Sequence, residues 1–318
     1  MAPSSPPRCI SEARGARNPA RFAPVFILTS ARSYSSVVCS MIGQHPDLAG
    51  LPELKLFAYP TVGELEDSLP RYWTLRGVTH RSPGLVRAVA QYRFHGQDLE
   101  SLALARAWLK DRRHWDGASV LDCLLETLAP RAGVEKSPEN ALTNEALDRL
   151  SSAYPRACYL HLTRHPVTTQ RSAEEHWNRV IPGHPQSGEP MAGIAAWVET
   201  HSRILRFSAS LGRGHYLRVK AEDALNDSRR TLGLIADWLG VRGDADAVEA
   251  MLHPELSPFA CFGPEGSGVT GGHDPGFLRS PAPRRVEVPL RVEQPAGWIE
   301  NGVLWRETVE LARRLGYP

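Results

Sequence analysis

A continuous apolar run, followed by a polar turn and a helical pattern, constrains the fold of this 318-residue chain more than any other feature. Residues 25–28 read Val-Phe-Ile-Leu, and such a run is typical of a strand that is buried on both faces. A hydroxyl-rich turn follows at residues 29–36. Apolar side chains then recur at helical spacing up to Pro46: Val37, Val38, Met41 and Ile42. A buried strand that leads directly into a helix indicates an α/β fold with a mostly parallel sheet.

The turn at residues 29–36 is also a candidate anion site. The first turn of a helix offers unpaired N–H groups and the positive end of the helix dipole. Arg32 adds a full positive charge, and the turn carries several serine hydroxyls. An ordinary strand-to-helix turn with solvated serines has the same composition, so this turn alone does not decide between the two interpretations.

Two further blocks follow the same plan. Residues 157–162, ACYLHL, read as another buried strand and lead into Arg164 and Pro166, with Ser172 further on. Pro166 suits the first turn of a helix, where its missing N–H costs nothing. Between the two strands lies Glu135-Lys136-Ser137-Pro138. Ligands of parallel α/β sheets bind at the carboxyl ends of the strands, which is where all three blocks are expected to fall. If Arg164 and Ser172 do not form a site, they are a surface arginine at a strand end and a serine on a helix face.

Together these blocks resemble the sulfotransferases that use 3′-phosphoadenosine-5′-phosphosulfate (PAPS). The resemblance rests on TSARSYSS followed by HPDLAGLPE, on EKSP, and on the spacing of Arg164 and Ser172. It covers most of the chain from Pro24 onward and is closest to bacterial members that act on polyketides and other secondary metabolites. It implies a three-layer, P-loop-like α/β fold with a helical cap. It also implies transfer of a sulfonate group from PAPS to a hydroxyl, with PAP as the product and no metal.

The first block departs from the usual sulfotransferase loop in two places. Ala31 stands where proline is usual, and Tyr34 stands where glycine is usual. A glycine there indicates close backbone approach or a permissive backbone angle. Tyr34 is therefore expected either to have an ordinary φ or to be strained.

The resemblance implies a set of nucleotide-binding residues. Those expected to bind the phosphosulfate are Arg32, Ser33, Tyr34, Ser35 and Ser36. Arg164 and Ser172 match the pair that holds the 3′-phosphate. Gly271 and Gly272 belong to a late loop that is expected to cover the nucleotide, although the usual Arg-Lys-Gly signature is missing.

Three residues are expected to be catalytic. Arg32 would stabilise the leaving phosphate, and Lys136 would bridge the phosphate and the sulfonate. Glu53 is the first candidate for the base that takes the acceptor proton, because a glutamate in this place serves as base in some sulfotransferases. Glu53 could instead be a solvated carboxylate or an ion-pair partner of Lys55 or Lys136. The alternative bases are histidines: His80, His95, His114 and His176.

The chain is expected to form one domain over residues 21–318, after a disordered segment at 1–20. That segment is rich in Pro, Ser, Ala and Arg and lacks the apolar stretch of a signal peptide. Residues 59–128 carry helical patterns with many aromatic side chains and are predicted to form the cap over the acceptor. The Gly- and Pro-rich segment 254–285 is predicted to form the nucleotide-covering loop.

Composition excludes several classes of partner. A formal net charge of +2 is too small to indicate nucleic acid or a membrane surface. No run of about 18 apolar residues is present to span a membrane. The five cysteines contain no CxxC pair, so they indicate reduced thiols of a cytoplasmic protein rather than a disulfide framework or a zinc site. The oligomeric state is left open.

Two rival functions remain at this point. A P-loop kinase would explain the first strand, turn and helix, but the GxxxxGK[ST] motif is absent. A non-catalytic nucleotide-binding or carrier-interacting module would keep the phosphate-binding residues without a base, and Glu53 and Lys136 argue against it. The acceptor itself, a small molecule or a hydroxyl tethered to a carrier protein, is left open.

Overall fold

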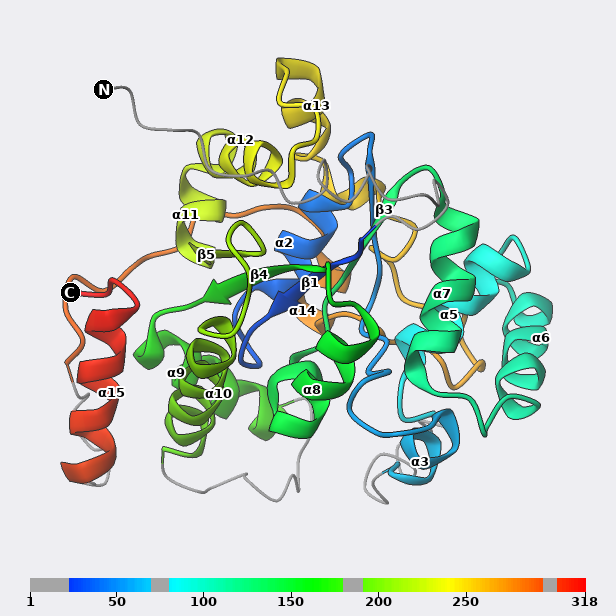
Figure 1. The fold of residues 1–318 in the computed structure, drawn as a ribbon, viewed down its shortest axis with the longest axis horizontal. Helices are drawn as coiled ribbons and strands as arrows, with labels where there is room; N and C mark the ends of the chain where they lie inside the picture. The colour runs from blue at the N-terminus through cyan, green and yellow to red at the C-terminus, as the bar shows by residue number, and fades with distance from the viewer. Residues whose placement is uncertain (1–22, 70–79, 180–190, 294–301) are drawn as a thin grey trace.

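The computed structural model describes residues 23–69, 80–179, 191–293 and 302–318 (Figure 1). The segment 1–20, which was predicted to be disordered, lies outside these ranges. So do Tyr72 and Trp73 of the predicted cap.

The core of the molecule is a sheet of five parallel strands. In chain order these are β1 (Val25–Leu28), β2 (Leu48–Gly50), β3 (Ala132–Glu135), β4 (Cys158–Thr163) and β5 (Tyr216–Lys220). The order across the sheet is β2-β3-β1-β4-β5, and every pairing is parallel. β1 is the central strand, and all four of its side chains are fully buried, as its apolar run predicted.

Helices cover both faces of this sheet (Figure 1). On one face lie α2 (Ser35–Ile42), α11 (Ala221–Asn226) and α12 (Ser228–Leu239), and on the other α8 (Asn144–Ala153), α9 (Pro166–Arg179) and α10 (Ala192–Ser208). Successive β1 side chains alternate between the two cores: Val25 and Ile27 pack with α2, whereas Phe26 and Leu28 pack on the opposite face. The predicted three-layer α/β fold is confirmed.

The remaining helices extend this framework. They are α13 (Ala245–Ala250), α14 (Pro275–Arg279), α15 (Gly302–Arg314) and two short 3₁₀ helices at Pro138–Ala141 and Pro254–Leu256. Within the described ranges, no helix is long and apolar enough to cross a membrane.

A group of helices at one end of the sheet forms the cap (Figure 1). It comprises α3 (Val62–Asp67), α5 (Pro83–Arg93), α6 (Leu99–Lys110) and α7 (Gly117–Leu128). Its apolar side chains, such as Leu85 and Leu121, share one hydrophobic core with Phe26 and Leu28 of the sheet. The cap is therefore anchored to the sheet by the same buried surface that stabilises the sheet.

One helix begins later than its pattern predicted. In the sequence, apolar residues recur at helical spacing at Leu142, Ala146, Leu147 and Leu150, and Ser137 precedes them. This pattern predicts a single helix over residues 139–154 with Ser137 as N-cap and Leu142 on the inner face. The structure has a 3₁₀ turn first, and the Thr143 side chain caps α8 by accepting from the Ala146 N–H. The Ser137 hydroxyl is engaged elsewhere, by Glu135 and by the Lys55 N–H. Leu142, expected on the inner face, is 48% exposed as a result.

The four cysteines within the described ranges divide into two states. Cys39, Cys123 and Cys261 are free thiols, as expected. Cys158 on β4 is disulfide-bonded, so the expectation of reduced thiols is wrong for this residue.

Candidate active site

The three blocks found in the sequence meet at the carboxyl edge of the sheet. The loop of residues 29–36, called the anion loop below, follows β1, while Lys136 follows β3 and Arg164 follows β4. The Lys136 ammonium donates to Ser36 Oγ at 3.1 Å. The Arg164 guanidinium donates to the Arg32 carbonyl at 2.6 Å. Both cations therefore contact the anion loop, each from one of the two strands that flank β1.

The anion loop contains two strained residues. Arg32 has φ 66° and Tyr34 has φ 58°, in the left-handed region that disfavours side chains. Each such residue costs on the order of 1 kcal/mol, so the loop is held by its surroundings. The Tyr34 ring lies under the Arg164 guanidinium, 3.9 Å from ring centroid to Cζ. A cation–π contact of this kind is unavailable to the glycine usual at this position, and it gives Tyr34 a role.

Helix α2 begins directly at this loop. No side chain caps its N-terminus, and its first turn carries no acidic residue. Ser35 and Ser36, the first two residues of the helix, are buried. The N-terminal N–H groups are thus available to an anion that binds in the loop.

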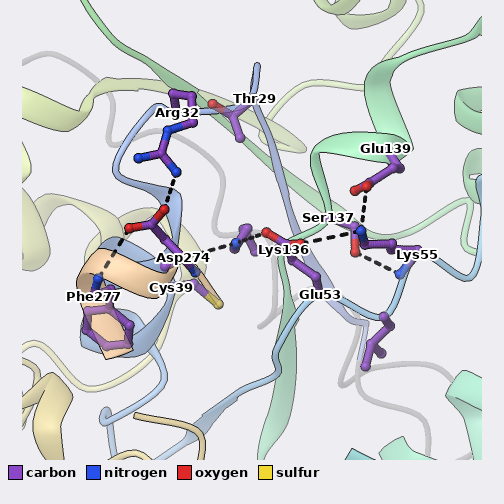
Figure 2. Close-up of polar contacts among 12 residues, drawn as sticks. Thr29, Arg32, Cys39, Glu53, Lys55, Lys136, Ser137, Glu139, Asp274 and Phe277 are labelled. Atoms are coloured by element: carbon purple, nitrogen blue, oxygen red, sulfur yellow. Dashed lines mark hydrogen bonds and ion pairs between the residues drawn. The ribbon is translucent and has the colours of Figure 1, made fainter. Parts of the chain in front are cut away.

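Arg32 contacts two residues that lie far from it in the chain, Ser172 and Asp274. Its Nε donates to Ser172 Oγ at 3.2 Å, and its guanidinium forms an ion pair with Asp274 (Figure 2). Arg164 and Ser172, predicted as a pair, are brought to the same place with Arg32 between them. Asp274 also accepts from the Gly276 and Phe277 N–H groups at the start of α14.

A second group of charges lies beside Lys136. Glu53 Oε1 is 2.6 Å from Lys136 Nζ, and Glu53 Oε2 is 3.7 Å from Lys55 Nζ (Figure 2). Lys55 Nζ is also 2.7 Å from Glu139. Burial raises the pKa of the Glu53 carboxyl, but the charges of Lys136 and Lys55 outweigh this, so the pKa lies below its usual range. Glu53 is an ionised carboxylate with 24% of its side chain exposed, whereas Lys136 is 1% exposed.

The buried carboxyl of Glu135 holds the backbone next to Glu53 in place. Glu135 accepts hydrogen bonds from the Leu54 N–H at 3.2 Å, from Asn140 Nδ2 at 2.7 Å and from the Ser137 hydroxyl. Burial raises the pKa of Glu135 to about 7. Glu135 thereby fixes the chain that carries Glu53. In the part of the chain that the structure describes, no three His, Cys, Asp or Glu side chains gather as a metal site would need.

The two predicted loop glycines lie between the Glu53 segment and the cap. The Gly272 carbonyl accepts from the Glu53 N–H at 2.8 Å, and the Gly271 carbonyl accepts from Arg87 at 3.0 Å. Gly272 has φ 121°, and a Cβ there would lie 2.9 Å from the Gly84 Cα. Only glycine fits at this position. Segment 254–285 therefore contacts both groups of charges. Gly272 accepts from the Glu53 N–H, and Asp274, two residues later, pairs with Arg32.

Comparison with known proteins decides the family. The profile of the Sulfotransferase family matches residues 24–246. The chain belongs to the sulfotransferase family. Its fold is similar to a sulfotransferase domain from the curacin biosynthetic pathway, with 22% identity, a TM-score of 0.70 and 93% of this chain and 98% of that chain covered. No curated protein matches this sulfotransferase.

A second solved structure is similar over the same extent. The sulfotransferase domain of the Synechococcus PCC 7002 olefin synthase has 27% identity and a TM-score of 0.67, with 93% of this chain and 94% of that chain covered. The predicted family, and its likeness to bacterial members from secondary-metabolite pathways, are confirmed. This sulfotransferase is an enzyme of sulfonate transfer, and nothing supports the kinase alternative.

The histidines that were alternative bases are scattered in this sulfotransferase. His80 is paired with Glu66 at 2.9 Å, and His95 and His114 are exposed. His176 lies on α9. Burial raises the pKa of Asp274, but the charge and hydrogen bond of Arg32, with a smaller contribution from His176, hold it below its usual range. The partner of His80 is thus Glu66 and not a residue of the group around Lys136.

His273 is a buried histidine near Lys136 that the sequence pattern did not single out. It is buried and packs edge-on against Phe277, with ring centroids 5.6 Å apart. Burial, followed by the charges of Lys136 and Arg87, holds its pKa well below the usual range. Its position in Gly-Gly-His-Asp-Pro was the available signal, but that motif was assigned to the covering loop as a whole.

Proposed function

We propose that this sulfotransferase transfers the sulfonate group of PAPS to a hydroxyl group of its acceptor. The residues present fit this donor. A 5′-phosphosulfate is an anion, and the anion loop offers a helix N-terminus, Arg32 and serine hydroxyls at one point. Arg164, seated on the Tyr34 ring, and Ser172 supply a second anion-binding group for the 3′-phosphate.

The contacts of Lys136 are the strongest support for this proposal. Its ammonium contacts Ser36 of the anion loop at 3.1 Å and the Glu53 carboxylate at 2.6 Å. It thus joins the group that would bind the donor to the group that would take the acceptor proton. In a purely nucleotide-binding module this buried link to a carboxylate would have no use.

The chemistry follows from these positions. The acceptor oxygen attacks sulfur while Glu53 takes the hydroxyl proton, and a new S–O bond forms. The bond between sulfur and the bridging phosphate oxygen breaks, and its electron pair leaves with PAP. Arg32 and Lys136 stabilise the negative charge that develops on the leaving oxygen. Catalysis is then largely positioning and charge stabilisation.

Lys136 would also control the basicity of the Glu53 carboxylate. While its ammonium is paired with Glu53, it holds the pKa of that carboxyl low. When Lys136 instead contacts the sulfonate oxygens, this stabilisation of the Glu53 anion weakens and Glu53 becomes a stronger base. The proton would then be taken up when the donor is in place.

For the acceptor, a hydroxyl on a small molecule or on a carrier-tethered intermediate is proposed. The two similar solved structures are domains of a curacin pathway and of an olefin synthase, which supports an acceptor from secondary metabolism. The cap contacts the Glu53 segment, because the Ser82 hydroxyl at the start of α5 donates to the Glu53 carbonyl at 2.7 Å, and the cap would therefore provide a wall for the acceptor.

Calorimetric titration with PAP, in the presence of EDTA, tests the donor assignment. Binding and a raised melting temperature are expected without metal, and ATP with Mg²⁺ serves as the comparison ligand. No heat at millimolar PAP would contradict the use of PAPS. Transfer of ³⁵S from labelled PAPS to a panel of free and carrier-tethered hydroxy acids then tests the acceptor class.

A further inference from the structure

A chain of buried polar side chains links the edge of the sheet to the anion loop. Tyr216 Oη is 2.7 Å from His161 Nδ1, and His161 Nε2 is 2.8 Å from His201 Nδ1. His201 Nε2 is 3.2 Å from Ser30 Oγ, which is 3.0 Å from Ser33 Oγ. We call these five residues the relay. Both histidines and Ser33 are fully buried.

The tyrosine and the two histidines of the relay come from three elements, β5, β4 and α10, whose arrangement Figure 1 shows. Tyr216 lies on β5 beside Tyr159 of β4, and His161 lies two residues further along β4, on the same face. His201 comes from α10, which covers that face. The Trp197 ring packs against the His201 ring, with ring centroids 4.9 Å apart. The relay reaches the anion loop from inside the protein.

Both histidines are neutral. Burial lowers the pKa of His201 to about 3, and burial together with His201 holds the pKa of His161 well below its usual range. A neutral imidazole has one donor and one acceptor nitrogen. The hydrogen bonds from Tyr216 through the two histidines to Ser30 can therefore run in only two directions, inward or outward. In the inward direction Ser30 accepts from His201, and Ser33 Oγ, 3.0 Å away, is the acceptor within reach of the Ser30 proton.

The distances favour the inward direction. A hydroxyl donor makes shorter hydrogen bonds than an N–H donor, with usual donor–acceptor distances near 2.7–2.8 Å and 2.9–3.0 Å respectively. The 2.7 Å contact at Tyr216 suits its hydroxyl as donor, and the 3.2 Å contact at Ser30 suits the His201 N–H as donor. The phenol of tyrosine is also more acidic than an aliphatic hydroxyl, so it favours the donor role.

We propose that His161 and His201 are positioning residues that fix the direction of the serine hydroxyls in the anion loop. Tyr216 donates to His161 Nδ1, His161 Nε2–H donates to His201 Nδ1, and His201 Nε2–H donates to Ser30 Oγ. Ser30 then donates to Ser33, and the Ser33 proton is left to donate to an anion in the loop. With the outward direction, Ser33 would donate to Ser30 and turn a lone pair toward the anion.

This role rests on the proposed function, because an anion must bind in the loop for the Ser33 proton to matter. Its physical benefit is preorganisation. A donor that is already oriented before the anion arrives costs no reorganisation on binding. Adjacent hydrogen bonds in such a chain also strengthen one another in a buried environment.

The tautomers provide a direct test that needs no ligand. Two-bond ¹H–¹⁵N correlation spectra of ¹⁵N-histidine-labelled protein distinguish Nε2–H from Nδ1–H imidazoles, and the spectra of His161→Gln and His201→Gln assign the signals. Nε2–H tautomers at both His161 and His201 are expected without ligand and with PAP. An Nδ1–H tautomer at either residue, or a charged ring, would overturn the proposal even if PAP binds normally.

A matched pair of variants tests the consequence for binding. His201→Leu and His201→Gln have similar volumes, but only glutamine can donate to Ser30. His201→Leu is expected to weaken PAP binding about fivefold, the equivalent of one neutral hydrogen bond, and His201→Gln is expected to restore it to within about twofold. Equal PAP affinity in the two folded variants would overturn the proposal. Absence of PAP binding in the unaltered protein would instead overturn the proposed function, and the tautomers would still decide the relay.

Discussion

The nucleotide side and the acceptor side of the site are built in different ways. The proposed nucleotide side, defined as the anion loop with Arg164 and Ser172, consists of residues in the loops and helices that follow the neighbouring strands β1 and β4. The acceptor side, defined as Glu53, Lys55, Lys136 and Glu139, depends on pairs far apart in the chain, such as Glu53 with Lys136. The first contains a continuous strand-to-helix loop, whereas the second depends on ion pairs between two separate segments, those that follow the neighbouring strands β2 and β3.

The two sides also differ in how their charges are arranged. On the nucleotide side, two arginines converge with Asp274 as the acidic partner of one of them, which suits an anionic ligand. On the acceptor side, positive and negative groups alternate from Lys136 through Glu53 and Lys55 to Glu139, which suits control of a proton (Figure 2). If this division is correct, substitutions should separate binding of the nucleotide from turnover.

Glu53→Gln should have the largest effect and should act on turnover alone. Loss of a positioned base costs about 10²–10⁴-fold in rate, whereas the nucleotide side is untouched. We therefore expect kcat to fall by at least 10²-fold and the calorimetric Kd for PAP to change less than twofold. His273→Gln is the comparison variant, since His273 is the buried histidine near Lys136.

Two outcomes would break the comparison at this residue. Full activity in Glu53→Gln together with inactive His273→Gln would transfer the role of base to His273. A change confined to KM in Glu53→Gln would mean that this carboxylate only orients the acceptor.

Arg164→Ala should show the opposite behaviour. A hydrogen bond between charged groups contributes about 1.5–3 kcal/mol, so PAP binding should weaken roughly 10- to 150-fold. Arg156→Ala is the matched control, because Arg156 is an exposed arginine just before the other end of β4. Unchanged PAP affinity in a folded Arg164→Ala variant would remove Arg164 from the nucleotide side.

The local construction explains why the nucleotide side could be predicted from the sequence. Arg32, the serines and Arg164 stand next to apolar runs whose strand character is plain, and parallel strands bring their carboxyl ends to one edge. The backbone of the loop could not be predicted, since the left-handed φ of Tyr34 depends on the contact with Arg164. That contact joins residues on different strands.

The acceptor side was predictable only in part. Glu53 and Lys136 could be named from the resemblance, but their separation of 2.6 Å depends on the order of strands in the sheet. The relay was not anticipated at all. Its histidines lie within an apolar strand and an amphipathic helix, where a buried histidine has no sequence pattern of its own.

Lys55 offers a finer test, because its effect should be on pH dependence. The charges of Lys136 and Lys55 lower the pKa of Glu53, and the base must be ionised to act. Lys55→Met removes one of these charges, so the pKa should rise and the acidic limb of the kcat/KM profile should move to higher pH. Lys55→Arg keeps the charge and should leave the limb in place. A limb that stays unmoved in Lys55→Met would show that Lys55 serves only Glu139.

Glu135→Gln should have the smallest effect, and it concerns the stability of the acceptor side. The pKa of Glu135 is about 7 in the folded protein and near 4.5 when exposed, so the folded state holds its proton over a range in which the unfolded state loses it. The stability contributed by this carboxyl is complete below about pH 4.5 and is lost as the pH rises toward 7. Glutamine cannot ionise, and Asn140 Oδ1, which has no hydrogen-bond partner among the described residues, can accept from the new amide.

The melting temperature of Glu135→Gln should therefore match that of the unaltered protein near pH 4.5 and exceed it by about 3–5 °C near pH 7. The pKa shift corresponds to roughly 2–3 kcal/mol, and 1 kcal/mol changes the melting temperature of a domain of about 300 residues by roughly 1.5 °C. Scanning calorimetry across this range measures the difference, and Glu126→Gln, at an exposed position on α7, is the control. A difference that stays constant with pH would mean that Glu135 keeps its charge in the folded state. The Glu53 segment would then be fixed by an ion pair with Lys136 and not by a neutral carboxyl, and the acceptor side would carry one more negative charge than described above.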